Sequence, residues 1–250
     1  KKESFTSFMK QVAVDLQQSG NLGTAHVYRS SLNAILTFQG SGCLSFPEIT
    51  PEWLKHFEGS LRARGCSWNT VSTYLRTLRA VYNRAVDLRK APYVPHLFRS
   101  VYTGTRADRR RALDAEDMKK VFARLLQSDA VTPAMRGAQE LFILMFLLRG
   151  LPFVDLAYLR KSDLRGRPLS VTLTSEAMFL LRKYMSREEQ SPYLFPILHS
   201  DEGSPMAYRE YQLALRNFNY QLELVGKLLG LKDRLSSYTA RHTWATTAYY

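Results

Sequence analysis

Two charged residues stand in the middle of the longest apolar run of this chain, and they are its first candidates for chemistry. The run, GAQELFILMFLLRGLPFVDLAYLRKSDL, covers residues 137–164, and the two residues are Arg149 and Asp155. Burying an unpaired guanidinium group costs several kcal/mol, so an arginine in this place needs an anion. Either Arg149 pairs with Asp155 or caps backbone carbonyls in the core, or it points into a cleft and binds a phosphate, which its planar fork of donors fits.

A second group of polar residues lies near the end of the printed sequence, in SSYTARHTWATT. Arg241 and His242 open a predicted helix, and Tyr238 precedes them by about one turn. Residues three and four positions apart share one face of a helix, and the start of a helix favours anions. Tyr238, Arg241 and His242 are therefore three groups that can hold a phosphate together.

The charge balance of the chain favours a polyanionic partner. The 250 residues include 35 Lys and Arg against 22 Asp and Glu, which gives a formal net charge of +13. The excess lies in the N-terminal part, since residues 1–112 hold 17 basic and 7 acidic residues, while residues 113–250 hold 18 and 15. Nucleic acid is the commonest partner for such a charge. An anionic membrane is the weaker alternative, because the sequence has no basic amphipathic helix with a Trp-rich or Phe-rich face.

Composition and cysteine content exclude several classes of protein. Hydrophobic residues make up 45% of the chain, enough for one large domain or two ordinary ones. No uncharged apolar stretch reaches the roughly 20 residues of a membrane span, and the first residues, KKESFTSF, lack the apolar core of a signal peptide. Cys43 and Cys66 have the spacing of neither a disulfide framework nor a zinc site. We expect a globular cytoplasmic protein without a metal.

The N-terminal part predicts a helical bundle. Apolar residues recur at helical spacing in four segments, residues 4–20, 23–40, 49–65 and 67–90. Thr50 is a predicted N-cap, with Pro51 at the first helical position. Short connections that contain glycine favour a compact arrangement of these helices.

The fourth predicted helix carries a basic ridge beside its apolar face. Only one acid, Asp87, is close to its arginines. Such a ridge is either a solvated surface or a phosphate contact, and the near absence of acids favours phosphate contact. We therefore predict that this helix binds DNA through Asn69, Thr70, Arg76, Arg79 and Arg84.

A basic linker is predicted after the helices. Residues 91–112 contain prolines and one glycine and have little periodicity. The run from Arg106 to Arg111 either lies along a sugar-phosphate backbone or forms a solvated hinge, and we add Arg106, Arg109 and Arg110 to the predicted DNA-binding residues. The predicted division is a helical DNA-binding domain over 1–100, a basic linker over 101–112 and a second domain over 113–250.

The second domain is predicted to be mostly helical with little strand. A helix starts after Asp114, which is a suitable N-cap. A short strand around Leu169 to Leu173 precedes a helix that begins near Ser175, and a helix of about six turns covers residues 208–230. The fold class is therefore mainly α.

Four stretches of the chain, in this order, resemble the tyrosine recombinase (phage integrase) family, in particular integrases of Bacteroides-type mobile elements. They are SWNTVSTYLRTLRAVYNRAV, RRALDAEDMKKVF, LLRGLPFVDLAYLRKSDL and SYTARHTWATT. The resemblance implies an N-terminal helical core-binding (SAM-like) bundle and a mixed, mostly helical catalytic domain with a small β-sheet. It also implies that a tyrosine cuts DNA through a 3′-phosphotyrosyl intermediate, with no metal or other cofactor.

The resemblance implies roles for the candidate residues. Arg241, followed by His242, matches the second arginine of the family's H-x-x-R motif, in which Tyr238 takes the place of the histidine. A phenol can donate a hydrogen bond to phosphate, but its pKa of about 10 makes it a poor proton shuttle. The family places its first arginine just after a Gly-Leu pair, where this chain has Pro152. Arg149 lies three residues earlier, a shift of nearly one helical turn, and takes this role. Asp155 matches the supporting acid.

Two parts that the resemblance implies have no match. The family has a β-hairpin with a catalytic lysine at this point of the chain, where only Arg165 to Pro168 stand here. Lys161 lies too early in the chain to be that lysine. The nucleophilic tyrosine lies well beyond the second arginine in the family, whereas Tyr249 and Tyr250 follow Arg241 too closely. We expect that segments of a longer protein are missing from the printed sequence, so that the catalytic domain is incomplete. The alternative is a degenerate, non-cleaving relative.

The leading hypothesis is a site-specific DNA recombinase, the integrase of a bacterial mobile element, in the cytoplasm and at the nucleoid. The resemblance implies double-stranded DNA as partner and a tetramer on DNA, and the free protein can be a monomer. No membrane is expected as a partner. A DNA-binding architectural or regulatory protein without chemistry is the alternative, and an RNA-binding helical protein is a third.

Overall fold

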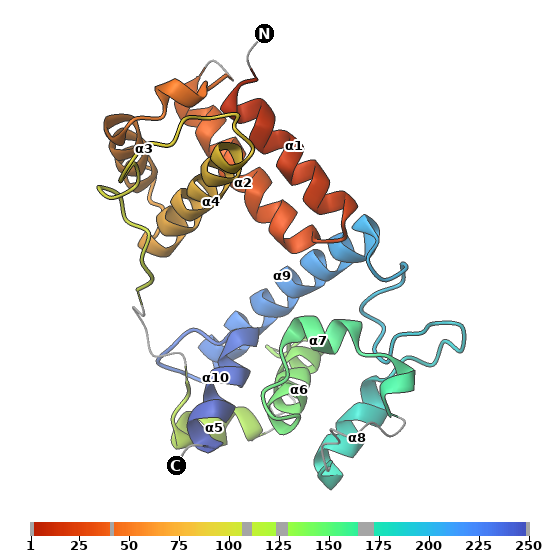
Figure 1. Ribbon diagram of the computed structural model, residues 1–250. Helices are drawn as coiled ribbons and strands as arrows, with labels where there is room; N and C mark the ends of the chain where they lie inside the picture. The colour runs from red at the N-terminus through yellow and green to blue at the C-terminus, as the bar shows by residue number, and fades with distance from the viewer. Residues whose placement is uncertain (1–2, 41–42, 107–111, 124–129, 165–172, 249–250) are drawn as a thin grey trace. The chain divides into compact units, whose positions relative to one another are not determined.

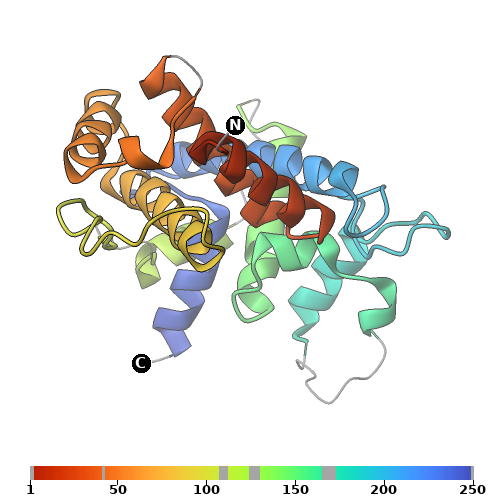
Figure 2. The same cartoon turned by 45° about the horizontal axis from the view of Figure 1, so that its top comes forward.

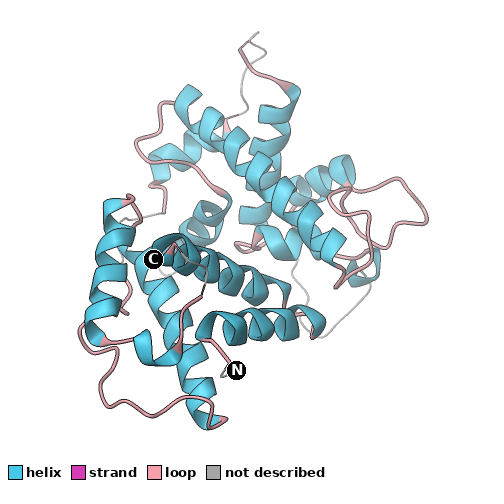
Figure 3. Ribbon diagram, turned by 90° about the horizontal axis from the view of Figure 1, so that it is seen from above, coloured by secondary structure: helices cyan, strands magenta, loops and turns pink. Residues whose placement is uncertain are grey.

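The computed structural model describes residues 3–40, 43–106, 112–123, 130–164 and 173–248. The chain divides into two compact units, Lys1–Asp108 and Arg109–Tyr250, and each has its own hydrophobic core (Figure 1). Helices make up nearly all of the regular structure in the described residues (Figure 3). The predicted mainly α fold is confirmed.

Strand content is very low in the described part of the chain. Its sole β pairing is an isolated antiparallel bridge between Arg160 and Tyr193. The predicted strand around Leu169 to Leu173 lies outside the described residues, except for Leu173 itself. The small β-sheet that we expected in the second domain is therefore not confirmed.

In its described part, the N-terminal unit is a bundle of four α-helices, as the apolar periodicity predicts. The side-chain oxygens of Ser4, Thr50 and Ser67 each accept a backbone N–H at the start of a helix. Helices α1 and α2 lie side by side, and α4 contacts the other three (Figure 2). The elements are α1 (Phe5–Gln18), α2 (Leu22–Gln39), the 3₁₀ turn η1 (Phe46–Glu48), α3 (Pro51–Ala63) and α4 (Trp68–Asp87).

The segment after α4 packs onto the bundle instead of leaving it. Leu97, Phe98 and Val101 are buried in the same core as the four helices. This segment lacks helical periodicity, but apolar side chains need no periodicity to reach a core. Leu97 and Phe98 thus pack in the N-terminal unit, and the predicted basic linker over residues 101–112 stays a prediction.

The C-terminal unit is organised around one apolar helix, α6. Thr132 caps this helix and Pro133 opens it, as the sequence rules for helix starts require. It is apolar on most sides because α5, α8, α9 and α10 all contact it. The elements are α5 (Ala115–Phe122), α6 (Pro133–Leu147), α7 (Phe153–Tyr158), the 3₁₀ turn η2 (Lys161–Leu164), α8 (Ser175–Tyr184), α9 (Pro205–Leu228) and α10 (Ser237–Ala248). No helix among the described residues has the length and apolar character to cross a membrane.

A buried carboxylate joins α6 to α8. Glu140 is 9% exposed, and it accepts hydrogen bonds from the Lys183 ammonium at 2.6 Å and from the Tyr184 hydroxyl. Burial and this carboxylate raise the pKa of Tyr184 far above its ordinary value. The two helices are therefore held by a charged contact in addition to apolar packing.

Candidate active site and nucleic-acid interface

Arg149 lies just past the end of α6 in an uncommon backbone conformation. Arg149 and Gly150 have φ angles of 59° and 70°, both in the left-handed region. Glycine adopts this region freely, whereas a residue with a side chain there costs about 1–3 kcal/mol. The turn satisfies the end of the helix, since Gly150 N–H donates to the Phe146 carbonyl at 3.3 Å and Leu151 N–H to that of Met145 at 3.0 Å. The structure therefore holds Arg149 in a strained position, as is common at functional sites.

The Arg149 side chain is exposed, so it is not the core arginine of the first alternative. The apolar run is not one buried helix, because α6 ends before Arg149 and the chain reverses before α7. Among the described residues, the Arg149 side chain has neither an ion pair nor a hydrogen bond, and Asp155 has no ion pair. Neither the predicted pairing with Asp155 nor the capping of carbonyls is present.

Gly150 places Arg149 beside α10. A Cβ atom added to Gly150 would lie 2.9 Å from the Cα atom of Arg241 and 3.2 Å from the Cβ atom of Trp244. The two backbones therefore touch, and the Cα atoms of Arg149 and Arg241 lie within roughly 8 Å of each other. Both arginine side chains are exposed. The fold thus brings together the two arginines that the sequence singled out, although they are far apart in the chain.

Tyr238 and His242 flank Arg241 on α10. Their ring centroids lie 4.4 Å apart with an interplanar angle of 74°. Tyr238 is 51% exposed, and His242 is half-buried. Tyr238 shares a helix face with both Arg241 and His242, which are three and four positions further along α10.

Polar contacts fix α10 against the rest of its unit. The Asn219 side-chain carbonyl on α9 accepts from the backbone N–H of Ser237, the first residue of α10, at 2.8 Å. The hydroxyl of Thr243 is fully buried and accepts from the backbone N–H of Leu113 at 3.0 Å. These bonds set the register of α10, and therefore the position of Arg241.

Asp155 lies in the first turn of α7 and is exposed. Its charge helps to raise the pKa of Tyr211 on α9, after burial and the effect of Tyr208. Asp155 is therefore close to α9, and its predicted support of the arginines stays a prediction. No cluster of His, Cys, Asp or Glu that could hold a metal ion occurs in the described part of the chain.

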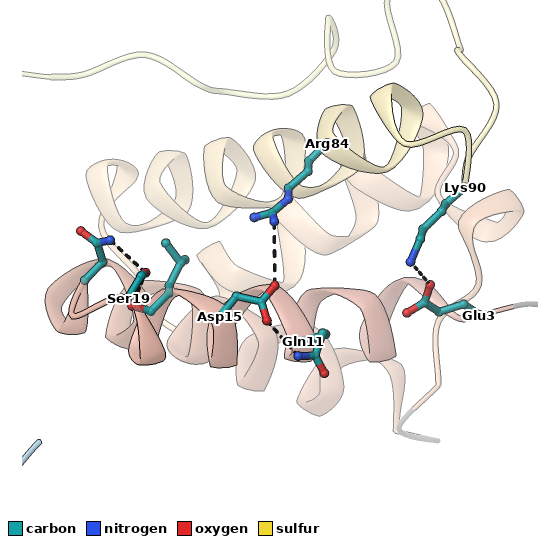
Figure 4. A network of polar contacts seen from close by, with 8 residues as sticks. Glu3, Gln11, Asp15, Ser19, Arg84 and Lys90 are labelled. Carbon is teal, nitrogen blue, oxygen red and sulfur yellow. Dashed lines mark hydrogen bonds and ion pairs between the residues drawn. The ribbon is translucent and has the colours of Figure 1, made fainter.

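In the N-terminal unit, the arginines of α4 differ in their contacts. Arg76 and Arg79 are exposed and, among the described residues, have no acidic partner. Arg84 lies 3.8 Å from Asp15 on α1, which also accepts from Gln11 at 2.9 Å (Figure 4). An exposed ion pair contributes only about 0–1 kcal/mol, so Arg84 can exchange Asp15 for a phosphate.

Asn69 binds the backbone of the chain that leaves the unit. Its side-chain amide donates to the Arg106 carbonyl and accepts from the Arg106 N–H, both at 2.9 Å. The Arg106 guanidinium lies over the rings of Trp68 and Tyr102, at 5.2 and 5.5 Å from their centroids. Asn69 therefore acts first as an anchor for Arg106, and its binding to DNA stays a prediction.

Two further predicted DNA-binding positions, Arg109 and Arg110, lie outside the described residues. The Thr70 hydroxyl is 2.9 Å from that of Ser67, at the cap of α4. Thr70 thus belongs to the start of the helix that carries the basic ridge.

Comparison with known proteins identifies the N-terminal unit. Residues 4–96 match the family model of the phage integrase SAM-like domain. The N-terminal unit is therefore similar to the SAM-like domain of phage integrases. A search of curated protein sequences gives no significant match.

The whole chain is similar in fold to two solved structures of a transposon integrase. One is the Tn1549 transposon integrase, solved as an arginine-to-lysine variant with a circular intermediate DNA, with a TM-score of 0.64 and 13% identity. Another is a tyrosine-to-phenylalanine variant of that integrase with transposon right end DNA, with a TM-score of 0.61 and 12% identity. Each alignment covers 98% of this chain and 86% of the other. At these identities the likeness establishes the fold.

The catalytic lysine and the nucleophilic tyrosine that the resemblance implies stay without a match. The bridge from Arg165 to Pro168, as well as Tyr249 and Tyr250, lies outside the described residues. Lys161 is described, and it serves a local contact: its ammonium donates to the Glu188 carbonyl and its N–H to that of Pro192 at 3.0 Å. Lys161 therefore joins η2 to the segment before Tyr193.

Sequence reasoning missed Gly150, Asn219 and Thr243 as residues that position Arg149 and Arg241. A signal existed for Gly150, because a glycine just after the last apolar residue of a helix predicts a left-handed end. The other two act across helices, and no spacing within one element reveals such a contact.

Proposed function

We propose that this protein is a site-specific recombinase that cuts and rejoins double-stranded DNA as the integrase of a bacterial mobile element. The observation that carries the proposal is the contact of Gly150 with Arg241, which joins two exposed arginines in a chain with a phage integrase domain. The nucleophilic tyrosine and the catalytic lysine are not assigned to residues of the printed sequence.

The chemistry needs what this pair of arginines offers. When a tyrosine oxygen attacks the scissile phosphorus, negative charge grows on the non-bridging oxygens, and the 5′ oxygen leaves with a proton as a hydroxyl. Guanidinium groups stabilise that charge with paired hydrogen bonds, and the loss of one such donor costs about 10²–10³ in rate. Tyr238 and His242 would add donors beside Arg241. The phosphotyrosyl ester keeps the energy of the cleaved bond, so rejoining needs no cofactor.

Double-stranded DNA is the proposed partner. The two integrase structures of the same fold were solved with DNA, and residues 1–112 of this chain carry most of its net positive charge. Arg76, Arg79 and Arg84 on α4 would bind phosphates beside the cleavage site. The proposed active form is a tetramer on DNA, formed from a free monomer.

A suicide-substrate assay tests the proposal. The full-length protein is incubated with nicked duplexes from the ends of its own element, and covalent protein–DNA adducts are counted on denaturing gels. We expect Arg149→Ala and Arg241→Ala each to slow adduct formation by about 100-fold or more. The control is Arg187→Ala, an exposed arginine outside the site, which should leave the rate unchanged. Normal adduct formation by Arg241→Ala would refute the proposal.

A DNA-binding protein without chemistry is the second candidate. It is favoured by Pro152 and Tyr238, which stand where the family places its first arginine and its histidine. It predicts binding that weakens steeply with salt, depends on Arg76 and Arg79, and is indifferent to Arg149 and Arg241. If no covalent adduct forms and DNA binding shows this dependence on salt and on Arg76 and Arg79, the protein is a DNA-binding protein without chemistry.

A further inference from the structure

A cavity of about 390 Å³ lies in the N-terminal unit, between α4 and the segment that follows it. Arg79 and Asn83 line it from α4, and His96 and Arg99 line it from the segment. The other lining residues are apolar, aromatic or threonine, and none is acidic. Two arginines, a histidine and an asparagine therefore line this cavity, and no lining residue carries a carboxylate.

The wall formed by the segment is built in advance of any ligand. The Tyr82 hydroxyl on α4 donates to the Pro92 carbonyl at 3.0 Å. At the other end, the buried carboxylate of Glu58 on α3 accepts from the Tyr102 N–H at 2.6 Å. Between these anchors, apolar side chains enter the core: Leu97, Phe98 and Val101. The segment has neither helix nor strand, but hydrogen bonds at both ends and buried side chains between them hold it against the bundle.

A tight turn places the two segment donors together. His96 has a φ of 57°, in the left-handed region, and its carbonyl accepts from the Arg99 N–H at 2.9 Å. This backbone conformation is strained. His96 and Arg99 from the turn line the same cavity as Arg79 from α4. Tyr93, which is 77% exposed, also lines the cavity and offers a ring to a sugar or base.

We propose that this cavity is a phosphate-binding site in which Arg79 and Arg99 hold the anion and Asn83 and His96 add donors. Forked guanidinium donors match phosphate oxygens, and the absence of acids leaves the positive charge uncompensated. This inference rests on the proposed function, under which the phosphate belongs to the DNA backbone beside the site of recombination. A free phosphate compound has the same chemistry and is the other source to test.

The first arm of the experiment uses duplex DNA and the full-length protein. We expect Arg99→Ala to weaken binding about tenfold and to lower the slope of log affinity against log salt by about 0.9, the value of one lost phosphate contact. Arg99→Lys should recover the slope but only part of the affinity. The control is Lys10→Ala, which removes one exposed charge of the same unit outside the cavity. Thermal unfolding confirms that each variant is folded.

Ethylation of single DNA phosphates then locates the contact. One ethylated phosphate should interfere with binding of the wild-type protein and not with binding of Arg99→Ala. If Arg79→Ala and Arg99→Ala keep wild-type affinity, salt slope and interference pattern, the inference is overturned while DNA binding, and with it the proposed function, survives.

The second arm uses inorganic pyrophosphate, titrated by calorimetry. If the wild type binds pyrophosphate through Arg99 but binds no DNA, the cavity is a phosphate site and the proposed function fails. If pyrophosphate binding depends on Arg99 while DNA binding does not, a free phosphate compound is the ligand. If the cavity substitutions change neither pyrophosphate binding nor DNA binding, the site does not exist.

Discussion

Gly150→Ala should separate the two arginines of the proposed active site. The new Cβ atom would stand 2.9 Å from the Arg241 Cα and 3.4 Å from its carbonyl oxygen, with the Cβ of Trp244 at 3.2 Å. Carbon atoms in contact need about 3.5–4.0 Å. Since the obstacle is backbone, α10 has to move away from the end of α6 by roughly 0.5–1 Å.

The expected cost has two parts. A φ of 70° strains any residue with a side chain, and this loss exceeds about 1 kcal/mol. Overpacking against backbone adds about 1–3 kcal/mol, so the free energy of unfolding should fall by about 2–4 kcal/mol. The effect on rate should be larger, because a misplacement of about 1 Å can cost 100-fold in a positioned reaction.

Denaturant unfolding and the adduct assay measure these two effects. Gly230→Ala is a matched control, since Gly230 has a φ of 62° but no atom within 4 Å of an added Cβ, so it carries the strain without the contact. Gly23→Ala, in the first turn of α2 with an open position, should be neutral or stabilising. If Gly150→Ala matches Gly230→Ala in stability and forms adducts at the wild-type rate, the contact does not position Arg241 and the reasoning is refuted.

Three further predictions concern contacts outside that turn. Glu140→Gln should lower the free energy of unfolding, measured in urea, by about 1–3 kcal/mol, because it breaks a buried charged contact. The control Glu116→Gln, in an exposed ion pair, should change it by less than about 1 kcal/mol. Burial and Glu140 raise the pKa of Tyr184 above its ordinary 10.0. The neutral phenol therefore contributes its full stability below about pH 10, and this contribution is lost as the pH rises further. In Tyr184→Phe the free energy of unfolding should fall less steeply at alkaline pH. Asn69→Ala should free the backbone of Arg106 and speed tryptic cleavage there, while Asn33→Ala on α2 should not; equal cleavage of the two variants would contradict the anchor.

The sequence by itself determined most of the helices, because their signals are local. Apolar spacing predicted the four helices of the N-terminal unit, and the predicted caps Thr50 and Asp114 both accept the expected backbone N–H. The longest helix, α9, begins at Pro205, earlier than predicted, since Ser204 caps it and proline suits the first position. A helix depends on contacts three and four residues apart, so its own sequence is enough to predict it.

The tertiary structure alone decided which residues meet. The hydrophobic pattern left open whether Arg149 lies in the core or points into a cleft, because a pattern does not show where a helix ends inside an apolar run. The loop of residues 91–103 lacks helical periodicity, yet its core contacts and its cavity with α4 depend on side chains from other elements. The approach of Arg149 to Arg241 depends on a glycine at one helix end and on the register of α10, which Asn219 and Thr243 set from elsewhere. Periodicity describes the face of one element, whereas a site is made where the faces of several elements pack, and that packing is a property of the whole fold.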